Sequence, residues 1–226
     1  MINQDYILLI FNCHKYRYKA EIQKKGWLQT LPKTIIYFHV IGEPTMKTDF
    51  SIDTTNKILY IKVEDDYNSL PKKVIRAYET ITKLYSFKYI FKTDDDQMCQ
   101  NMRMLDTIIN SLNKRTQTNK FHYGGQIVDV TQSYNSQYFL IHPELPKDLI
   151  VKATKYCSGR FYFLSNEAIV DLITKKEEIE CEYLEDYAVG YFLNNMFKTT
   201  ILNLETNKYF TDMEPCKFLE GEEVFW

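Results

Sequence analysis

The sequence is poor in glycine and proline, with seven and six in 226 residues, which argues against a loop-dominated or fibrous protein. It also lacks an excess of positive charge, because 28 basic residues stand against 30 acidic ones for a formal net charge of −2. Proteins that bind nucleic acids normally carry a basic excess that neutralises phosphates. This balance therefore disfavours nucleic-acid binding as the main function.

The five cysteines are far apart and form no CxxC pair, which disfavours a disulfide framework or a structural zinc site and favours reduced thiols. The apolar run "YILLIF" at 6–11 is too short to span a bilayer and lacks the flanks of a signal peptide. We therefore expect a cytoplasmic protein without a membrane span. Abundant Lys, Asn, Ile and Tyr suggest an A·T-rich coding sequence from a large DNA virus or a bacterium; a viral protein would lie in the host cytoplasm.

Hydrophobic residues are 45% of the chain and aromatic residues 15%, which is enough for a packed core in one domain spanning 1–226. Apolar runs predict strands at 5–11, 34–41, 58–63 and 87–92, with later strands near 121–130, 160–164 and 199–203. Apolar residues at helical spacing predict helices over 70–85 and 101–113, a third capped by Ser165, and a last one over about 185–197. Because the early strands are apolar on both faces and alternate with helices, we expect an α/β fold with a mostly parallel sheet.

Three consecutive carboxylates follow the fourth predicted strand, in "FKYIFKTDDDQMC" at 87–99. Ligands of such sheets gather at the carboxyl ends of the strands, which is where Asp94, Asp95 and Asp96 lie. Mg²⁺ and Mn²⁺ prefer oxygen ligands and often combine one or two carboxylates with substrate phosphates. A solvated acidic turn, or a helix start with acidic first-turn residues, is the alternative that the motif alone leaves open.

A second acidic pair, Glu185 and Asp186, lies in "CEYLEDYAVGYF" at 181–192. It would serve either as a helix cap or as a general base, and a positioned carboxylate contributes about 10²–10⁴-fold to proton transfer. Between the two acidic motifs, Ser158 and Gly159 in "KYCSGRFYFLSNEA" predict a tight turn that lets backbone approach a ligand.

Four segments, in this order, resemble the β-1,3-galactosyltransferase-like (fringe-like) glycosyltransferases. They are "EDDYNSLPKKV" at 64–74, "YIFKTDDDQM" at 89–98, "YCSGRFYFLS" at 156–165 and "EDYAVG" at 185–190. The resemblance implies a GT-A-like three-layer α/β/α sandwich. Residues 1–98 would form the nucleotide-sugar-binding half and residues 99–226 the acceptor-binding half.

The resemblance also implies a reaction, namely inverting transfer of a hexose or N-acetylhexosamine from a UDP-sugar to an acceptor hydroxyl, forming a β-1,3-type linkage. It makes Asp96, with Asp94, the ligand of Mn²⁺ or Mg²⁺, and Asp186 the base, with Glu185 as the fallback. The implied partners are a nucleotide-sugar donor and a glycan, glycoprotein or other hydroxyl acceptor. The residues expected to contact the donor are Asp94, Asp95, Lys92, Ser158 and Gly159.

The sequence departs from the family pattern at Arg160 and Phe161, where glycines are usual, so we expect an altered donor or acceptor pocket. No histidine follows the second acidic motif, where many enzymes of this fold carry one that completes the metal site, so either diphosphate and water fill the remaining positions or a residue such as Asp212 or Glu214 substitutes. His142 is a candidate acceptor-site residue. Aromatic side chains suit sugar stacking, and the candidates beside the motifs are Trp27, Tyr67, Tyr156, Tyr162 and Tyr187.

Two other functions remain open at the level of sequence. One is a metal-dependent phosphoryl-transfer or phosphatase-like enzyme, because acidic clusters at strand ends also serve that chemistry. The other is a catalytically silent carbohydrate-binding protein with the same fold.

Overall fold

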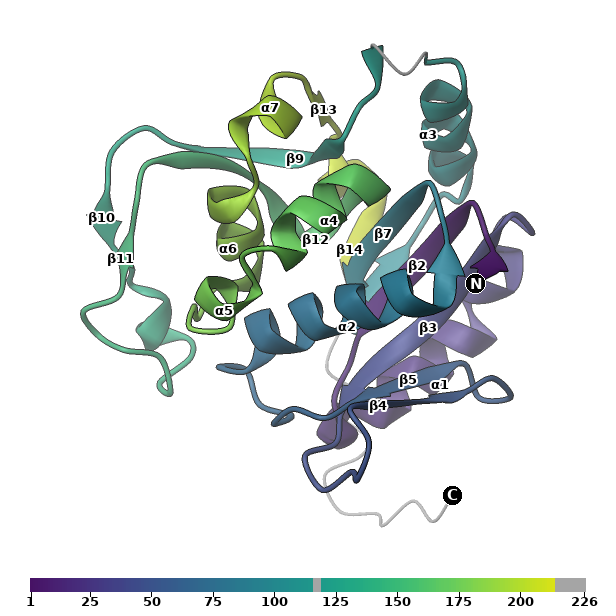
Figure 1. Cartoon of the computed structure of the whole chain (residues 1–226), viewed down its shortest axis with the longest axis horizontal. Helices are drawn as coiled ribbons and strands as arrows, with labels where there is room; N and C mark the ends of the chain where they lie inside the picture. Colours follow the sequence, from purple (N-terminus) through teal and green to yellow (C-terminus); the bar gives the residue numbers. More distant parts are fainter. Residues whose placement is uncertain (116–118, 214–226) are drawn as a thin grey trace.

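The computed structural model describes residues 1–115 and 119–213 (Figure 1). Its centre is an eight-stranded sheet with the strand order β13-β9-β12-β7-β2-β3-β5-β4. The strands of this sheet are β2 (Tyr6–Phe11), β3 (Ile35–Gly42), β4 (Phe50–Asp53), β5 (Ile58–Ile61), β7 (Tyr89–Asp94), β9 (Tyr123–Val130), β12 (Thr154–Ser165) and β13 (Ile201–Asn203). Three two-stranded pairs accompany it: β1 (Ile2–Asn3) with β6 (Tyr85–Ser86), β8 (Gln97–Cys99) with β14 (Phe210–Asp212), and β10 (Tyr134–Asn135) with β11 (Ile150–Val151).

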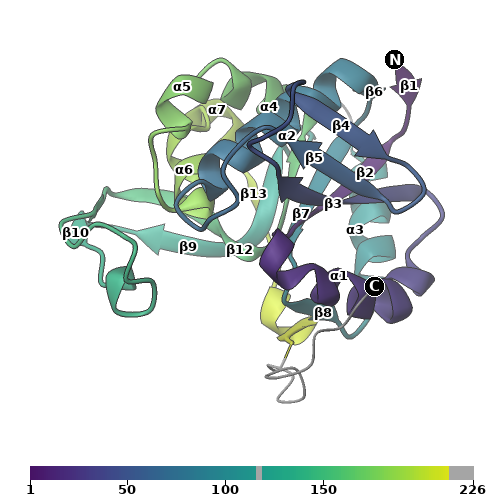
Figure 2. The ribbon, with the colours of Figure 1, turned by 90° about the horizontal axis from the view of Figure 1, so that it is seen from below.

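The helices cover both faces of this sheet. They are α1 (Arg17–Lys25), α2 (Leu70–Leu84), α3 (Arg103–Asn113), α4 (Asn166–Ile173), α5 (Lys176–Ile179), α6 (Glu185–Phe192) and α7 (Asn195–Lys198). Figure 2 shows α2, α4 and α6 on one side of the sheet and α1 and α3 on the other. No helix in the described part of the chain is both long enough and apolar enough to cross a membrane.

Strand directions agree with a mostly parallel sheet. Strands β7, β2, β3 and β5 pair in parallel, and β9 and β13 also pair in parallel. Only β12 and β4, among the strands of the eight-stranded sheet, pair antiparallel with their neighbours on every side. The predicted α/β class with a mostly parallel central sheet is therefore confirmed.

The central strands are buried on both faces, as their apolar sequences predict. In β2, residues Ile7, Leu9 and Phe11 pack into a core with α2, α4 and α6. The alternate residues of the same strand, among them Leu8 and Ile10, pack into a second core with α3. The period of two along the strand thus separates the two layers of core, which confirms the three-layer sandwich.

Two local predictions are wrong. The helix expected over 185–197 is interrupted after Phe192, and α7 starts anew with Asn194 as its N-cap, accepting a hydrogen bond from Met196 N at 3.0 Å. The turn expected at Ser158–Gly159 is instead an irregular stretch inside the twelve-residue β12, whose register on β9 shifts between Cys157 and Tyr162. The residues on both sides of this stretch are paired, with β9 up to Cys157 and with β7 from Phe161 onward, and these pairs keep the chain extended between them.

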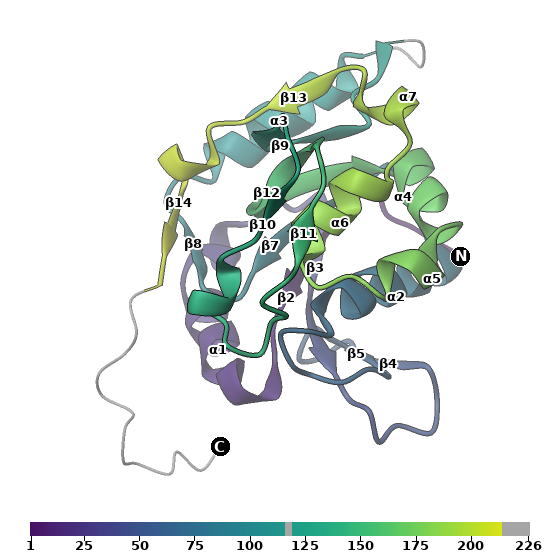
Figure 3. The same cartoon turned by 90° about the vertical axis from the view of Figure 1, so that its left-hand side faces the viewer.

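Between β9 and β12 the chain leaves the sheet as an arm, which we define as residues 131–153. It carries β10, β11 and a short helical turn at Tyr138–Leu140, and it projects to the left in Figure 1 and lies in front of the sheet in Figure 3. A third apolar cluster lies at its base, where Leu145 and Val151 group with Tyr156, Leu184 and Tyr187. The arm is therefore a packed part of the domain.

Candidate functional site

A cavity of about 590 Å³ opens beside the carboxyl end of β7. Its lining includes residues 94–96, Gly159 of β12, and Glu185 and Asp186 at the start of α6. The two acidic motifs, which are about ninety residues apart in the sequence, therefore face the same space. Residues from both predicted halves of the chain line it.

Backbone contacts hold the acidic tripeptide at this edge. Asp94 pairs with Phe11 at the end of β2, and the next amide, Asp95 N, donates to Phe11 O at 3.1 Å. The buried Gln23 amide of α1 donates to Asp94 O at 3.2 Å and to Gln97 O at 2.9 Å. The turn that follows β7 is thus fixed on both sides.

Gly190 explains how α6 reaches the same cavity. A Cβ atom at this position would lie 2.2 Å from Tyr156 Cβ and 2.7 Å from its Cα, so only glycine lets the helix pack this closely on β12. This close approach brings the first turn of α6, with Glu185 and Asp186, to the cavity. The glycine of the "EDYAVG" segment thus has a packing role.

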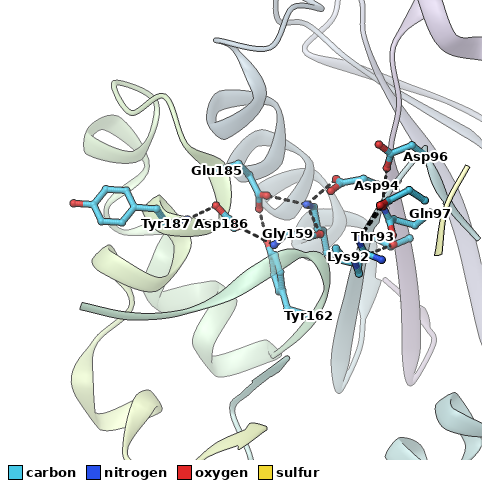
Figure 4. A network of polar contacts seen from close by, with 12 residues as sticks. Lys92, Thr93, Asp94, Asp96, Gln97, Gly159, Tyr162, Glu185, Asp186 and Tyr187 are labelled. Atoms are coloured by element: carbon cyan, nitrogen blue, oxygen red, sulfur yellow. Dashed lines mark hydrogen bonds and ion pairs between the residues drawn. The ribbon is translucent and has the colours of Figure 1, made fainter. Parts of the chain in front are cut away.

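Lys92 lies at the centre of the site (Figure 4). Its side chain is fully buried, and its Nζ contacts Asp94 Oδ1 at 2.7 Å, Glu185 Oε2 at 2.8 Å and the carbonyl of Gly159 at 2.9 Å. Burial lowers the pKa of Lys92, but the charges of Asp94 and Glu185 outweigh it, so the pKa lies above its ordinary value. Lys92 is therefore a charged internal bridge between β7 and α6 that also lines the cavity, and its predicted contact with the donor stays a prediction.

Glu185 and Asp186 have different environments. Glu185 is buried and accepts a 2.5 Å hydrogen bond from the Tyr162 hydroxyl in addition to its ion pair with Lys92. Asp186 is partly buried and accepts hydrogen bonds from Gly159 N at 2.9 Å and Tyr187 N at 2.8 Å. Burial raises the pKa of Asp186, and the Lys92 charge and these two bonds oppose the rise. The geometry thus favours Asp186 over Glu185 as the proton acceptor.

The position of Gly159 shows how close the two acidic motifs are to each other. The point where its Cβ would lie is 3.5 Å from Asp94 Oδ2 and 3.5 Å from Asp186 Oδ2, so these oxygens are no more than twice that distance apart. Lys92 Nζ is 3.2 Å from the same point. A glycine here therefore leaves the space between the two carboxylates open.

The fit of a divalent cation follows from the carboxylates on the cavity wall. Within residues 1–115 and 119–213, no group of three or more His, Cys, Asp or Glu is arranged to hold a metal ion by itself. However, Mg²⁺ commonly uses one or two carboxylates and takes its other ligands from substrate phosphates and water. Asp94 and Asp96, both on the cavity wall, provide a donor set of that kind.

The predicted substitutes for a third ligand have separate outcomes. Asp212 is held by Arg160 at 2.9 Å, and its Oδ1 accepts a 2.8 Å hydrogen bond from Gln97 Nε2, which also donates to Asp96 Oδ1 at 2.9 Å. Asp212 is therefore next to the acidic tripeptide but engaged in an ion pair. Glu214 lies outside the described residues.

Cationic side chains lie on the other side of the acidic tripeptide. Lys19 of α1 contacts Asp95 Oδ1 at 3.3 Å and lies over the Tyr16 ring at 4.2 Å from its centroid, while Lys15 lines the same wall. Burial raises the pKa of Asp95 to about 7, and the Lys19 charge opposes the rise. Asp95 is thus paired with an internal cation, and Lys15 and Lys19 place two positive charges beside the carboxylates at this end of the cavity.

Several predicted pocket residues lie elsewhere. Phe161 is fully buried between Phe91 and Phe210, and Arg160 reaches β14, so the expectation that both alter the pocket directly is wrong. Ser158 lies next to the cavity-lining Gly159 on the irregular part of β12. Of the predicted stacking residues, Trp27, Tyr162 and Tyr187 are core residues, whereas Tyr67 and Tyr156 line the cavity together with His142.

Lys15, Lys19 and Tyr138 also line the cavity, and sequence reasoning missed them. No pattern in the sequence indicates Tyr138, because the helical turn that holds it is only three residues long. For Lys92 there is a signal, because a lysine inside an otherwise apolar strand indicates a buried ion pair.

Comparison with known proteins places this geometry in a family. The galactosyltransferase family model matches residues 20–202. The UDP-GalNAc:beta-1,3-N-acetylgalactosaminyltransferase 2 of Xenopus tropicalis is 22% identical over 172 residues, covering 74% of this chain and 33% of that protein. Its Xenopus laevis counterpart is 21% identical over 146 residues, covering 62% and 27%. The chain thus spans a third or less of the length of these curated relatives.

Among solved structures, the glycosyltransferase GlyE of Streptococcus pneumoniae TIGR4 is similar with a TM-score of 0.46 and 11% identity. The match covers 91% of this chain and 46% of that one. The family assignment depends on the sequence match, because the galactosyltransferase model covers most of the chain, from within α1 to β13, and leaves out only β1, β2 and β14 among the strands described. The chain belongs to the galactosyltransferase family.

Proposed function

We propose that this protein is a metal-dependent inverting glycosyltransferase that moves a hexose or N-acetylhexosamine from a UDP-sugar to an acceptor hydroxyl, forming a β-1,3-type linkage. One observation carries the proposal. Asp94 and Asp186, from different elements, face one cavity across the open space at Gly159 in a chain of the galactosyltransferase family. The UDP donor and the β-1,3 linkage are supported by the activity that the names of the Xenopus relatives state.

The donor would bind on the side of the acidic tripeptide. Asp94 and Asp96 would hold Mn²⁺ or Mg²⁺, which when bound supplies charge neutralisation for the leaving diphosphate. Lys15 and Lys19 would add positive charge at the same end of the cavity. Asp95, which is already paired with Lys19, would position that lysine rather than contact the nucleotide.

Asp186 would act on the acceptor. Its carboxylate takes the proton of the acceptor hydroxyl while the hydroxyl oxygen forms a bond to the anomeric carbon of the donor sugar. The bond from that carbon to the diphosphate oxygen breaks with its electron pair leaving on the diphosphate, so the configuration inverts. Lys92, which also donates to the Gly159 carbonyl, holds the Asp94 carboxylate, and the Gly159 amide holds the Asp186 carboxylate. Fixed positions of these groups lower the entropic cost of aligning the two substrates.

The proposal is tested with the purified protein and a panel of UDP-galactose, UDP-N-acetylgalactosamine, UDP-glucose and UDP-N-acetylglucosamine. We expect release of UDP with at least one donor, dependent on added Mn²⁺ or Mg²⁺ and abolished by a chelator. Asp96→Asn should lose this turnover, whereas Asp106→Asn, an exposed change on α3, should keep it. Release of inorganic phosphate without sugar transfer, or metal-dependent binding of a UDP-sugar without turnover across a broad acceptor screen, would contradict the proposal.

A further inference from the structure

The wall of the cavity near Asp186 differs from the cationic end, because it is aromatic. Tyr67, Tyr138, His142 and Tyr156 lie on this wall, which we call the aromatic wall. Burial raises the pKa of each of the three tyrosines, and the negative charge of Asp186 is the next largest cause of the rise. The aromatic wall is thus electrostatically coupled to the proposed base.

Three segments build this wall, namely the loop before α2, the arm and the start of β12. The ring of Tyr67, in the loop before α2, stacks on His142 of the arm with ring centroids 3.8 Å apart and planes within 10°. Beside this stack, Asn68 Nδ2 donates to Glu144 O at 3.1 Å. These two contacts attach the arm to the loop that precedes α2.

The arm is also closed on itself and attached to α6. Within the arm, Ser136 N donates to Leu149 O at 2.8 Å, and Lys152 N donates to the hydroxyl of Tyr187 on α6 at 3.1 Å. Leu145 belongs to the apolar cluster that also contains Tyr156 and Leu184. The aromatic wall is therefore formed before any ligand binds, and preorganisation of this kind reduces the entropic cost of binding.

Tyr138 stands out among these residues because it is half-exposed. Its exposed fraction is 46%. Tyr156, by contrast, is only 8% exposed and packs against Gly190 of α6. An aromatic ring that faces a polar cavity offers a flat apolar surface, and its hydroxyl offers a hydrogen bond. A pyranose ring, with one apolar face and a rim of hydroxyls, matches both.

We propose that the aromatic wall is the acceptor subsite, and that the arm, through Tyr138 and His142, determines which pyranoside is accepted. This inference rests on the proposed function, since the acceptor hydroxyl must approach Asp186. The acceptor sugar stacks on the Tyr138 ring with one hydroxyl directed to the Asp186 carboxylate. The Tyr67–His142 stack positions Tyr138 for this contact.

Tyr134 provides a matched control. It lies on the same arm with a similar exposed fraction, 44%, and it is outside the cavity lining. We expect Tyr138→Ala to raise the acceptor KM about three- to tenfold, as the loss of one ring contact implies. Tyr138→Phe, which keeps the ring, should remain close to wild type, and Tyr134→Ala should be unchanged. The rate of UDP-sugar hydrolysis by water should be unchanged in Tyr134→Ala, because this residue lies outside the cavity lining.

A binding measurement separates this inference from the proposed function. Methyl β-glycosides of galactose, glucose, N-acetylgalactosamine and N-acetylglucosamine are titrated into the full chain without donor or metal, and saturation-transfer NMR records contact with aromatic protons. We expect at least one glycoside to bind, with its signal reduced in Tyr138→Ala and retained in Tyr134→Ala. Absence of glycoside binding, equal effects of the two variants, or an acceptor KM that responds only for peptide acceptors would overturn the inference. If the wild-type protein turned over none of the UDP-sugars, the proposed function would be overturned instead.

Discussion

Replacement of Lys92 by methionine should destabilise the protein strongly, because it removes the cation between two carboxylates. Methionine keeps most of the aliphatic stem, so the loss of packing is small. The side chain is fully buried between Asp94 and Glu185, at 2.7 and 2.8 Å. Breaking a buried ion pair by removing one partner costs about 3–5 kcal/mol, since the remaining charge is left without compensation. We therefore expect the free energy of unfolding of Lys92→Met to fall by about that amount in urea titrations followed by circular dichroism.

Lys88 supplies the control for distance. Its Nζ is 2.7 Å from Asp5 Oδ2, the same separation as in the Lys92–Asp94 pair. However, the side chains of Lys88 and Asp5 are both more than half exposed. Exposed pairs contribute about 0–1 kcal/mol, because water screens them and side-chain entropy opposes them. Lys88→Met should therefore change the free energy of unfolding by less than about 1 kcal/mol. The comparison isolates burial as the cause.

A second substitution tests whether the orphaned charge causes the loss. In the Lys92→Met background, Glu185→Gln neutralises one of the two carboxylates that Lys92 leaves behind, so the double variant should be less destabilised than the sum of the single variants. Coupling energies between contacting residues are about 0.5–3 kcal/mol, and we expect a value in that range. If Lys92→Met costs no more than Lys88→Met, or if the two substitutions add without coupling, the account of the buried bridge is refuted.

Three further predictions concern other parts of the structure. Gly190→Ala should lower the free energy of unfolding by about 1–3 kcal/mol, because the new Cβ overlaps Tyr156. Gly26→Ala, where the nearest atom to the new Cβ is 3.1 Å away, should lower it by less. Equal urea midpoints for the two variants would contradict this. Burial lowers the pKa of His39 to about 3 from an ordinary 6.5, so the unfolded state binds the extra proton and stability is lost as pH falls below 6.5. His39→Phe should remove about 2 kcal/mol of the loss between pH 7 and 5, and a variant with the wild-type pH dependence would exclude the mechanism. Because burial raises the pKa of Asp186, kcat should fall with decreasing pH at a pH above the ordinary carboxyl range; a fall only near pH 4 or below would contradict it.

The fold could be predicted to a large extent because its central strands are encoded locally. Strands such as "YILLIF" are apolar on both faces, and this property alone places them in the middle of a helix-covered sheet. The break after Phe192 was not predictable in the same way, since the apolar pattern continues through it. The extended conformation at Ser158 and Gly159 depends on the pairing of the flanking residues of β12 with β7 and β9, which are distant in the sequence.

In the candidate site, too, some features are encoded locally and others depend on distant parts of the chain. The acidic motifs could be located because strand ends collect ligands and because carboxylates in a row need partners. The partners themselves, such as Lys19 for Asp95, come from other elements and follow no local pattern. Tyr138 lies in a short helical turn of the arm, and its contribution to the cavity appears only when the arm is folded against the loop at Tyr67.

The most direct test of the account is the kinetic effect of Asp186→Asn. This change keeps the size of the side chain and an oxygen that can accept from Gly159 N or Tyr187 N, but it removes the ability to take a proton. With a UDP-sugar that the wild type uses, we predict a loss of about 10²–10⁴-fold in kcat, while the affinity for UDP in the presence of Mn²⁺, measured by calorimetry, stays within a few-fold of wild type. Wild-type kcat in this variant would contradict the assignment of Asp186, and with it the claim that the two acidic motifs serve one reaction.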